Sequence, residues 1–188
     1  MRNLKTITLA FVALISFSVN AQTSKIDAKK SNINWIGRKV TGEHSGTIGI
    51  KEGSLTFAKK ALKGGTFTVD MSTIVCTDIK DAGSKAGLEG HLKADDFFGT
   101  AKYATSKLVF TKVTLKSKGV YTVTANLTIK DKTNPITFDL TVAGKTATAK
   151  LMVDRTKYDI KYNSKSFFGS IGDKAIDDEF ELNVNLAW

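Results

Sequence analysis

The chain is poor in the residues that usually carry chemistry: it has one cysteine, one proline and two histidines. Cys76 cannot form an internal disulfide, so the fold must be held together by its core. A catalytic thiol needs an activating neighbour, and no histidine lies near Cys76 in sequence. We therefore interpret Cys76 as an inert, buried residue.

Recognisable catalytic and metal-binding motifs are also missing. His44 and His91 lack the tight His/Cys spacing of metal sites, and neither a nucleophile elbow nor a phosphate-binding glycine loop is present. The acidic run at residues 177–179 opens a strand and is typical of a solvated turn. We therefore predict no catalytic residue, no metal and no cofactor. The alternative left open is a hydrolase or isomerase that uses His44 or His91.

Long apolar runs are absent after the N-terminus. There, Arg2 and Lys5 precede an apolar run at residues 7–19, and Val19-Asn20-Ala21 follows it. This is the three-part pattern of a secretory signal, and the run is shorter than the about 20 residues of a membrane-spanning helix. We expect a cleaved signal peptide at residues 1–21, one domain at residues 22–188, and a periplasmic or secreted protein. An uncleaved N-terminal anchor is the alternative.

Positive charge is in excess. Residues 22–188 carry 26 basic and 18 acidic side chains, a net charge of +8. The lysines are scattered along strand-like runs and form no arginine-rich stripe, and export argues against nucleic acid as a partner. A solvated lysine-rich surface is the simplest interpretation, with weak attraction to anionic lipid head groups as a further expectation. The sequence leaves open whether the protein is a monomer or a homodimer.

Alternation of apolar and polar residues dominates the rest of the chain. Runs with a period of two, typical of half-buried antiparallel strands, include residues 121–129, 136–142, 147–153 and 180–186. The parity changes between Phe110 and Val113, which predicts a β-bulge near Thr111. Turn signals occur at residues 118–119, 131–135 and 143–144.

One segment departs from this alternation. Residues 81–94 favour a short helix, although Gly83, Gly87 and Gly90 weaken it. About eight strands with one apolar face each must close into a barrel or stack as a sandwich, and short turns favour the barrel. We therefore predict an all-β fold, an eight-stranded antiparallel barrel with one helical insertion. A barrel of this size is either filled by side chains or holds one small ligand.

Several blocks match a known family. They are Asn34-Trp35, GTFTVDM at residues 65–71, HLKADDFF at 91–98 and LTIK at 127–130, and the last two are the most specific. On these blocks the chain resembles the YceI family of secreted lipid-binding proteins over essentially all of residues 22–188. The resemblance implies a lipocalin-like barrel with a long apolar cavity that binds a polyisoprenoid or similar amphiphile for carriage or storage.

The resemblance also implies which residues lie near a ligand. It assigns the helical lid block His91, Leu92, Phe97 and Phe98. To these we add the other matched positions and apolar residues of the strands and the helix. The predicted ligand-binding residues are then Trp35, His44, Phe67, Leu88, His91, Leu92, Phe97, Phe98, Phe110, Leu127, Ile129, Phe138, Arg155 and Tyr158.

A second function class stays open at this point. An envelope stress-response or interaction module would have a filled barrel core and no ligand. The expected inward-facing Ala125, Ala147 and Ala149 leave room inside and weigh mildly against it. The aromatic pairs Phe97-Phe98 and Phe167-Phe168 fit either a plug of core residues or the mouth of an apolar cavity.

Overall fold

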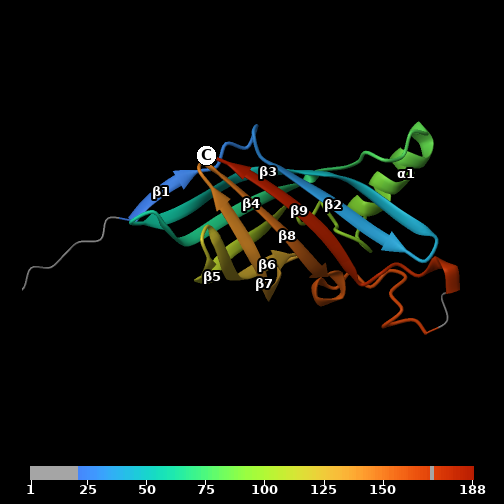
Figure 1. Cartoon of the computed structure of the whole chain (residues 1–188). Coiled ribbons are helices and arrows are strands. Elements are labelled where there is room, and N and C mark those ends of the chain that lie inside the picture. Colours follow the sequence, from blue (N-terminus) through green and yellow to red (C-terminus); the bar gives the residue numbers. More distant parts are fainter. Residues whose placement is uncertain (1–20, 170–171) are drawn as a thin grey trace, which may run out of the picture.

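A computed structural model describes residues 21–169 and 172–188 of the chain (Figure 1). Apart from Ala21, which begins the first strand, the predicted export signal at residues 1–21 lies outside this part. The strands described are β1 (Ala21–Lys25), β2 (Asn32–Lys39), β3 (Gly42–Ala58), β4 (Ala61–Cys76), β5 (Thr105–Ser117), β6 (Val120–Ile129), β7 (Lys132–Ala143), β8 (Thr146–Asp154) and β9 (Glu179–Ala187).

The strands close into an antiparallel barrel. Each strand from β2 to β9 pairs with the next along the chain, and β9 pairs back onto β2. β1 lies outside this ring, because β2 covers only residues 42–48 of the long strand β3 and β1 pairs with residues 54–58. The predicted eight-stranded barrel is confirmed, with β1 as an added edge strand.

The alternation of the sequence explains the register. A strand with one buried face cannot slip by one residue without exposing that face. In β6, Tyr121, Val123, Ala125, Leu127 and Ile129 are all buried, as their parity predicts. The predicted bulge in β5 is confirmed as well, because the β5–β6 pairing shifts register between Phe110 and Lys112.

The turn predicted over residues 131–135 is shorter than expected. Lys130 and Asp131 alone form it, both with positive φ, and β7 already begins at Lys132. Pro135 therefore lies inside a strand. It is tolerated there because β8 pairs only with residues 140–143 of β7, so this part of β7 is an edge on the β8 side.

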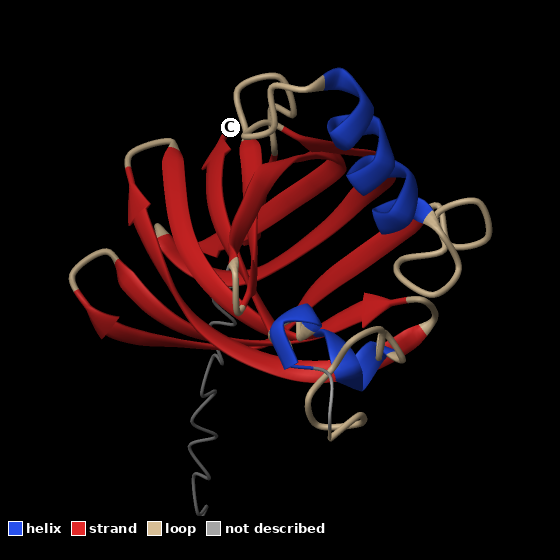
Figure 2. Cartoon of the chain, turned by 90° about the vertical axis from the view of Figure 1, so that its right-hand side faces the viewer, coloured by secondary structure: helices blue, strands red, loops and turns tan. Residues whose placement is uncertain are grey.

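Helix α1 (Ala82–Lys93) confirms the predicted helical insertion. Asp81 caps it by accepting a hydrogen bond from the Ser84 amide at 2.8 Å. Figure 1 shows α1, the β2–β3 turn and the segment that follows β8 at the same end of the barrel. Figure 2 looks at this end and shows α1 and the short helices η1 (Arg155–Tyr158) and η2 (Gly172–Lys174) at different places around its rim.

The opposite end of the barrel is packed with side chains. The Phe57 ring packs against the Trp188 ring with centroids 5.6 Å apart. Leu55, Leu62 and Tyr121, on the strands at this end, are buried. Within the described ranges, no helix has the length and apolar composition needed to cross a membrane.

Candidate functional site: an apolar cavity in the barrel

The barrel encloses a cavity of about 360 Å³. All the barrel strands from β2 to β9, helix α1 and the segment between η1 and β9 contribute to its wall, which is almost entirely apolar. Ligand-binding cavities in proteins usually measure about 300–1,000 Å³, and an apolar cavity of about 150 Å³ already holds benzene. The interior therefore has room for part of an apolar chain.

The structure brings nearly all the predicted ligand-binding residues to this cavity. Its wall includes Trp35, His44, Phe67, Leu88, His91, Leu92, Phe97, Phe98, Phe110, Leu127, Ile129, Phe138 and Arg155. They come from strands, from α1 and the turn after it, and from η1, and they meet because the barrel closes. That they contact a ligand stays a prediction.

Tyr158 is the exception. It belongs to η1 and is buried, but its side chain is not part of the cavity wall. Burial raises the pKa of Tyr158 to about 12, and the carboxylate of Asp154 adds to the effect. Its position in the core gives it a packing role in the turn after β8.

Sequence reasoning missed other parts of the wall. Most of these residues are inward-facing strand positions, which the alternation marks as buried but cannot single out as lining a void: Ile33, Ile48, Ile50, Val69, Met71, Ile74, Leu108, Leu140, Ala149, Leu151, Leu182, Val184 and Leu186. Tyr162 also lines the cavity; Tyr158, Ile160 and Tyr162 alternate with charged residues, but this short segment forms no strand.

Two groups of aromatic rings shape the cavity. Phe110 lies between Phe67 and Phe138, with centroid distances of 5.7 and 6.0 Å. Phe98 lies between Phe97 and Phe180, at 5.5 and 6.1 Å. Tilted and edge-to-face pairs at such distances are attractive, so the rings hold one another in place and keep the wall rigid.

Glycine makes room for one of the large rings. A Cβ atom at Gly46 would lie 1.8 Å from the Val75 carbonyl oxygen and 2.6 Å from the Trp35 ring. The missing side chain lets the indole cross β3, where its Nε1 donates a hydrogen bond to the Val75 carbonyl at 3.2 Å. Gly46 therefore fixes the orientation of Trp35 in the cavity wall.

Polar groups of the wall gather at the end where α1 lies. Arg38, Lys39 and His44 come from the β2–β3 hairpin, and His91 comes from the last turn of α1. The His91 Nε2 lies 3.3 Å from an oxygen of Asp96, and its ring packs edge to face on Tyr162 with centroids 4.4 Å apart. This end is the mouth of the cavity, and it combines apolar walls with a polar rim.

His44 belongs to a separate polar cluster at the mouth. The Asp78 carboxylate accepts from the Ser45 amide and from the Cys76 thiol, both at 3.0 Å, and lies 2.9 Å from the His44 Nδ1. Burial raises the pKa of the Cys76 thiol, and its hydrogen bond to Asp78 raises it further. A nucleophilic thiol needs the opposite environment.

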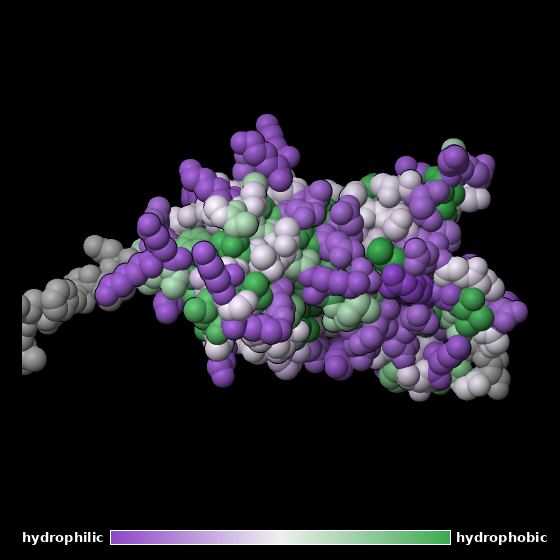
Figure 3. Space-filling view, viewed as in Figure 1, coloured by the Kyte–Doolittle hydropathy of each residue, from purple (hydrophilic) through white to green (hydrophobic). Residues whose placement is uncertain are grey.

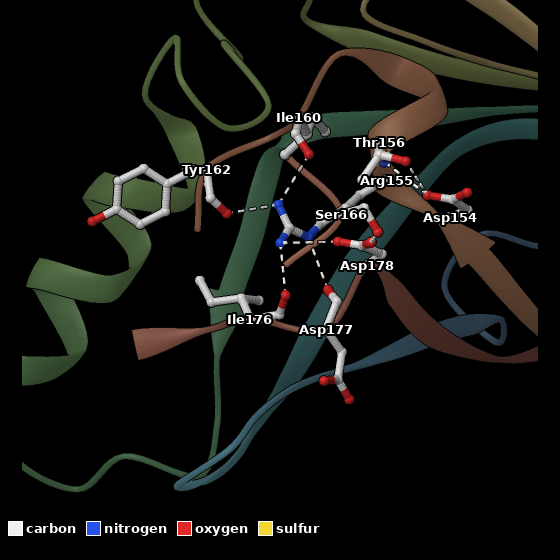
Figure 4. Close-up of polar contacts among 9 residues, drawn as sticks. All are labelled: Asp154, Arg155, Thr156, Ile160, Tyr162, Ser166, Ile176, Asp177 and Asp178. Carbon is white, nitrogen blue, oxygen red and sulfur yellow. Dashed lines mark hydrogen bonds and ion pairs between the residues drawn. The ribbon is translucent and has the colours of Figure 1, made fainter. Parts of the chain in front are cut away.

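Arg155 links the two backbone segments at the mouth, residues 160–162 and 176–177 (Figure 4). Its guanidinium is buried and donates four hydrogen bonds of 2.9 Å to backbone carbonyls of Ile160, Tyr162, Ile176 and Asp177. Asp178 lies 3.8 Å away as the counter-charge. Burial lowers the pKa of Arg155, while Asp178 opposes this shift. Although Arg155 lines the cavity, its donors are occupied by the chain itself.

The two histidines do not form one site. Each is paired with its own aspartate, His44 with Asp78 and His91 with Asp96. Within residues 21–169 and 172–188, no group of three His, Cys, Asp or Glu side chains is arranged to hold a metal ion.

The comparisons with known proteins agree with this geometry. The family model described as the YceI-like domain matches residues 25–188. The chain belongs to the YceI-like domain family. The match covers the barrel strands β2 to β9 and the helical insertion, which confirms the resemblance found in the sequence blocks. Among curated protein sequences, none matches significantly.

Solved structures show the same YceI-like fold. BcnA of Burkholderia cenocepacia is 19% identical with a TM-score of 0.65, and the match covers 87% of this chain and 99% of that one. A polyisoprenoid binding domain from Saccharophagus degradans is 15% identical with a TM-score of 0.57, covering 86% and 95%. The Campylobacter jejuni YceI protein is 15% identical with a TM-score of 0.53, covering 100% and 90%.

Proposed function

We propose that this protein binds a long-chain isoprenoid or a similar amphiphilic lipid in its barrel cavity, for carriage or storage in the cell envelope and without catalysis. The observation that carries the proposal is the apolar cavity inside the barrel with its polar rim. An amphiphile has the matching arrangement, with an apolar chain for the wall and a polar end for the rim.

The energetics of such a complex need no specific polar contact. Burial of about ten CH₂ groups contributes about 8 kcal/mol at about 0.8 kcal/mol each, before the costs of ordering the chain. This corresponds to dissociation constants on the order of micromolar. A flexible hydrocarbon chain is therefore retained by the cavity wall alone.

Two polar groups at the mouth suit the head of the lipid. His44 and His91 are each about one-third exposed and line the cavity near its rim. Their imidazoles accept or donate hydrogen bonds, so they suit an alcohol, an amide or a carbonyl. Arg155 is less suited to the head group, because four of its five N–H groups already bind backbone carbonyls.

Family membership supports the proposal, since one structural relative is itself named a polyisoprenoid binding domain. The absence of catalysis is supported by the chemistry of the mouth. The Cys76 thiol donates a hydrogen bond to the Asp78 carboxylate, and this contact and burial raise its pKa, which disfavours the thiolate that a nucleophile needs. The signal pattern predicted at residues 1–21 supports a carrier that works in the periplasm or outside the cell.

Mass spectrometry of lipids extracted from natively purified protein tests the proposal directly. We expect an isoprenoid or another long-chain amphiphile in stoichiometric amount. In parallel, the fluorescent fatty acid cis-parinaric acid should bind to the delipidated protein and be displaced by farnesol. A protein that carries no lipid and leaves the probe fluorescence unchanged contradicts the proposal and favours a ligand-free interaction module.

Cavity-filling substitutions locate the binding. Ser106 and Ala149 line the cavity with small side chains, so Ser106→Phe and Ala149→Phe should each weaken probe binding by about tenfold or more by occupying the space of the chain. Ala101 is exposed outside the cavity, and Ala101→Phe is the matched control. Thermal unfolding reports whether each variant is folded, and equal binding by all three variants places the ligand elsewhere.

A further inference from the structure

Exposed apolar side chains concentrate near the cavity mouth. Phe167 and Phe168 are 49% and 54% exposed, Val40 is 53% exposed and Tyr162 is 39% exposed. Val40 lies in the β2–β3 turn and the three aromatic residues follow η1, at the end of the molecule that carries the mouth (Figure 1). Large apolar side chains exposed together on a protein surface mark an interaction site.

Backbone hydrogen bonds join these residues into one surface. The Val40 amide donates to the Ala175 carbonyl at 3.3 Å, and the Ile176 amide donates to the Asn163 carbonyl at 2.9 Å. The Phe168 amide in turn donates to the Ser164 carbonyl at 3.0 Å. The β2–β3 turn and the segment with the aromatic pair are therefore held next to each other, and Arg155 anchors the same segment from below. We call Val40, Tyr162, Phe167 and Phe168 the rim patch.

Lysines surround the rim patch. Lys161 lies over the Phe167 ring, with its Nζ 4.8 Å from the centroid. Lys39, Lys165 and Lys174 are exposed, and in the described part of the chain none of the three forms an ion pair. Figure 3 shows hydrophobic surface set among hydrophilic side chains at this end of the molecule.

We propose that the rim patch docks on the surface of a bilayer that contains anionic phospholipids, with Phe167 and Phe168 inserted among the head groups and the lysines against the phosphates. Exposed aromatic residues ringed by lysines are the composition of interfacial membrane-binding surfaces. The proposal rests on the lipid-binding function above. A lipid that moves between the membrane and the cavity has to pass through the mouth, and docking by the rim patch turns the mouth toward the bilayer.

Charge favours a bilayer over a second copy of the chain. Residues 22–188 carry a net charge of +8, and Lys39, Lys165 and Lys174 lie beside the rim patch without ion pairs in the described residues, whereas Lys161 pairs with Asp159 at 3.1 Å. Two rim patches facing each other therefore repel. An anionic lipid surface removes this repulsion, and each lysine close to it raises the binding affinity by about fivefold. It also accepts aromatic rings without requiring a pocket to receive them.

Vesicle co-sedimentation with the folded full-length mature protein tests the docking. We expect binding to vesicles of phosphatidylcholine with phosphatidylglycerol, weaker binding to phosphatidylcholine alone, and a loss of binding as salt rises from about 0.1 M to about 0.5 M. The variants Phe167→Ser/Phe168→Ser and Lys165→Glu/Lys174→Glu should each lower the affinity by about tenfold or more.

Two controls match these variants elsewhere on the barrel. Val109 and Leu115 are exposed apolar residues of β5, and Val109→Ser/Leu115→Ser removes the same kind of surface away from the mouth. Lys107→Glu/Lys112→Glu makes the same change in net charge on β5. Both controls should bind vesicles like the wild-type protein. In addition, a tryptophan in Phe168→Trp should be quenched by brominated phospholipid, whereas one in Leu115→Trp should not.

Each alternative result overturns the docking proposal. The proposal is wrong if the wild-type protein does not bind vesicles. It is also wrong if the rim variants bind vesicles as well as their controls do. Concentration-dependent dimerisation that the Phe167→Ser/Phe168→Ser variant abolishes, without vesicle binding, assigns the patch to a second copy instead. Binding of cis-parinaric acid added without vesicles is measured on the same variants. It should be unchanged in them, so loss of docking is distinguishable from failure of the cavity to bind lipid.

Discussion

His91 and Tyr162 meet edge to face at the cavity mouth, with ring centroids 4.4 Å apart. His91 belongs to the last turn of α1, whereas Tyr162 lies in the segment that Arg155 anchors after η1. The pair therefore links the helical insertion to the opposite part of the rim. Because both rings line the cavity, this contact forms part of the rim of its mouth.

Removing the Tyr162 ring should open the mouth. Aromatic pairs contribute about 0.5–1.5 kcal/mol beyond their buried area, so Tyr162→Ala should speed dissociation of cis-parinaric acid by about threefold to tenfold. Stopped-flow dilution of the loaded protein measures the rate. Tyr103→Ala is the control, since Tyr103 is half-buried and does not line the cavity. Equal rates in the two variants contradict a closing role for the His91–Tyr162 pair.

A side chain at Gly46 should displace Trp35. The added Cβ of Gly46→Ala would lie 1.8 Å from the Val75 carbonyl oxygen, which is backbone and cannot move aside cheaply. Overpacking of this kind costs about 1–3 kcal/mol and occasionally more, so we expect a loss of about 3 kcal/mol in the free energy of unfolding. Urea unfolding followed by tryptophan fluorescence measures it.

Gly37 provides the comparison for Gly46. It lies in the neighbouring strand β2, and a Cβ there has no atom within 4 Å. Gly37→Ala should therefore leave stability nearly unchanged. If both alanine variants unfold at the same urea concentration, the close approach at Gly46 does not determine the position of Trp35.

The fold could be predicted from the sequence because each strand buries one face. The parity of residues 121–129 decides which side chains point inward, and the change of parity between Phe110 and Val113 is itself the signature of the bulge. Pro135 was misleading as a turn signal. Its place inside β7 depends on how far β8 pairs with β7, which is a long-range property of the barrel.

The site was predictable only in part. Alternation shows that a side chain points inward, but whether the interior is filled or hollow depends on the volumes of residues from all the strands together. The segment from Tyr158 to Tyr162 alternates apolar and charged residues like a strand, yet it pairs with no neighbouring strand. The resemblance indicated Tyr158, whereas Tyr162 lines the cavity, because the side-chain hydrogen bonds of Arg155 and the local backbone hydrogen bonds set the path of this segment.

Asp78 should make stability depend on pH in the acid range. Burial raises its pKa, but the hydrogen bonds from Cys76, Ser45 and His44 outweigh burial and hold the pKa well below its usual value. Its contribution to stability is therefore present above the unfolded-state pKa of about 4 and is lost as the pH falls below it. Asp78→Asn should destabilise the protein by about 1 kcal/mol at neutral pH, since the side chain is one-third exposed.

The pH profile separates this effect from a general loss of packing. Urea midpoints measured from about pH 5 to about pH 3 should converge for the wild-type protein and Asp78→Asn. Asp173→Asn is the control, because Asp173 is exposed and forms no ion pair in the part of the chain described. A constant difference between Asp78→Asn and wild type over this range contradicts the role of the charge.

Arg155 should be essential for the rim. Arg155→Met keeps a long buried side chain but leaves four carbonyl oxygens without their donors and Asp178 without its counter-charge. Removing one partner of a buried charge network costs about 3–5 kcal/mol, whereas a surface ion pair contributes about 0–1 kcal/mol. Arg38→Met, which removes a partly exposed arginine paired with Glu43 and Glu181, is the matched control.

Urea unfolding should show the large loss of stability for Arg155→Met alone. Amide hydrogen exchange should be faster at Ile160 and Ile176, whose amides are hydrogen-bonded in the same segment. Equal stability of the two variants would show that the rim is held by its backbone hydrogen bonds without Arg155.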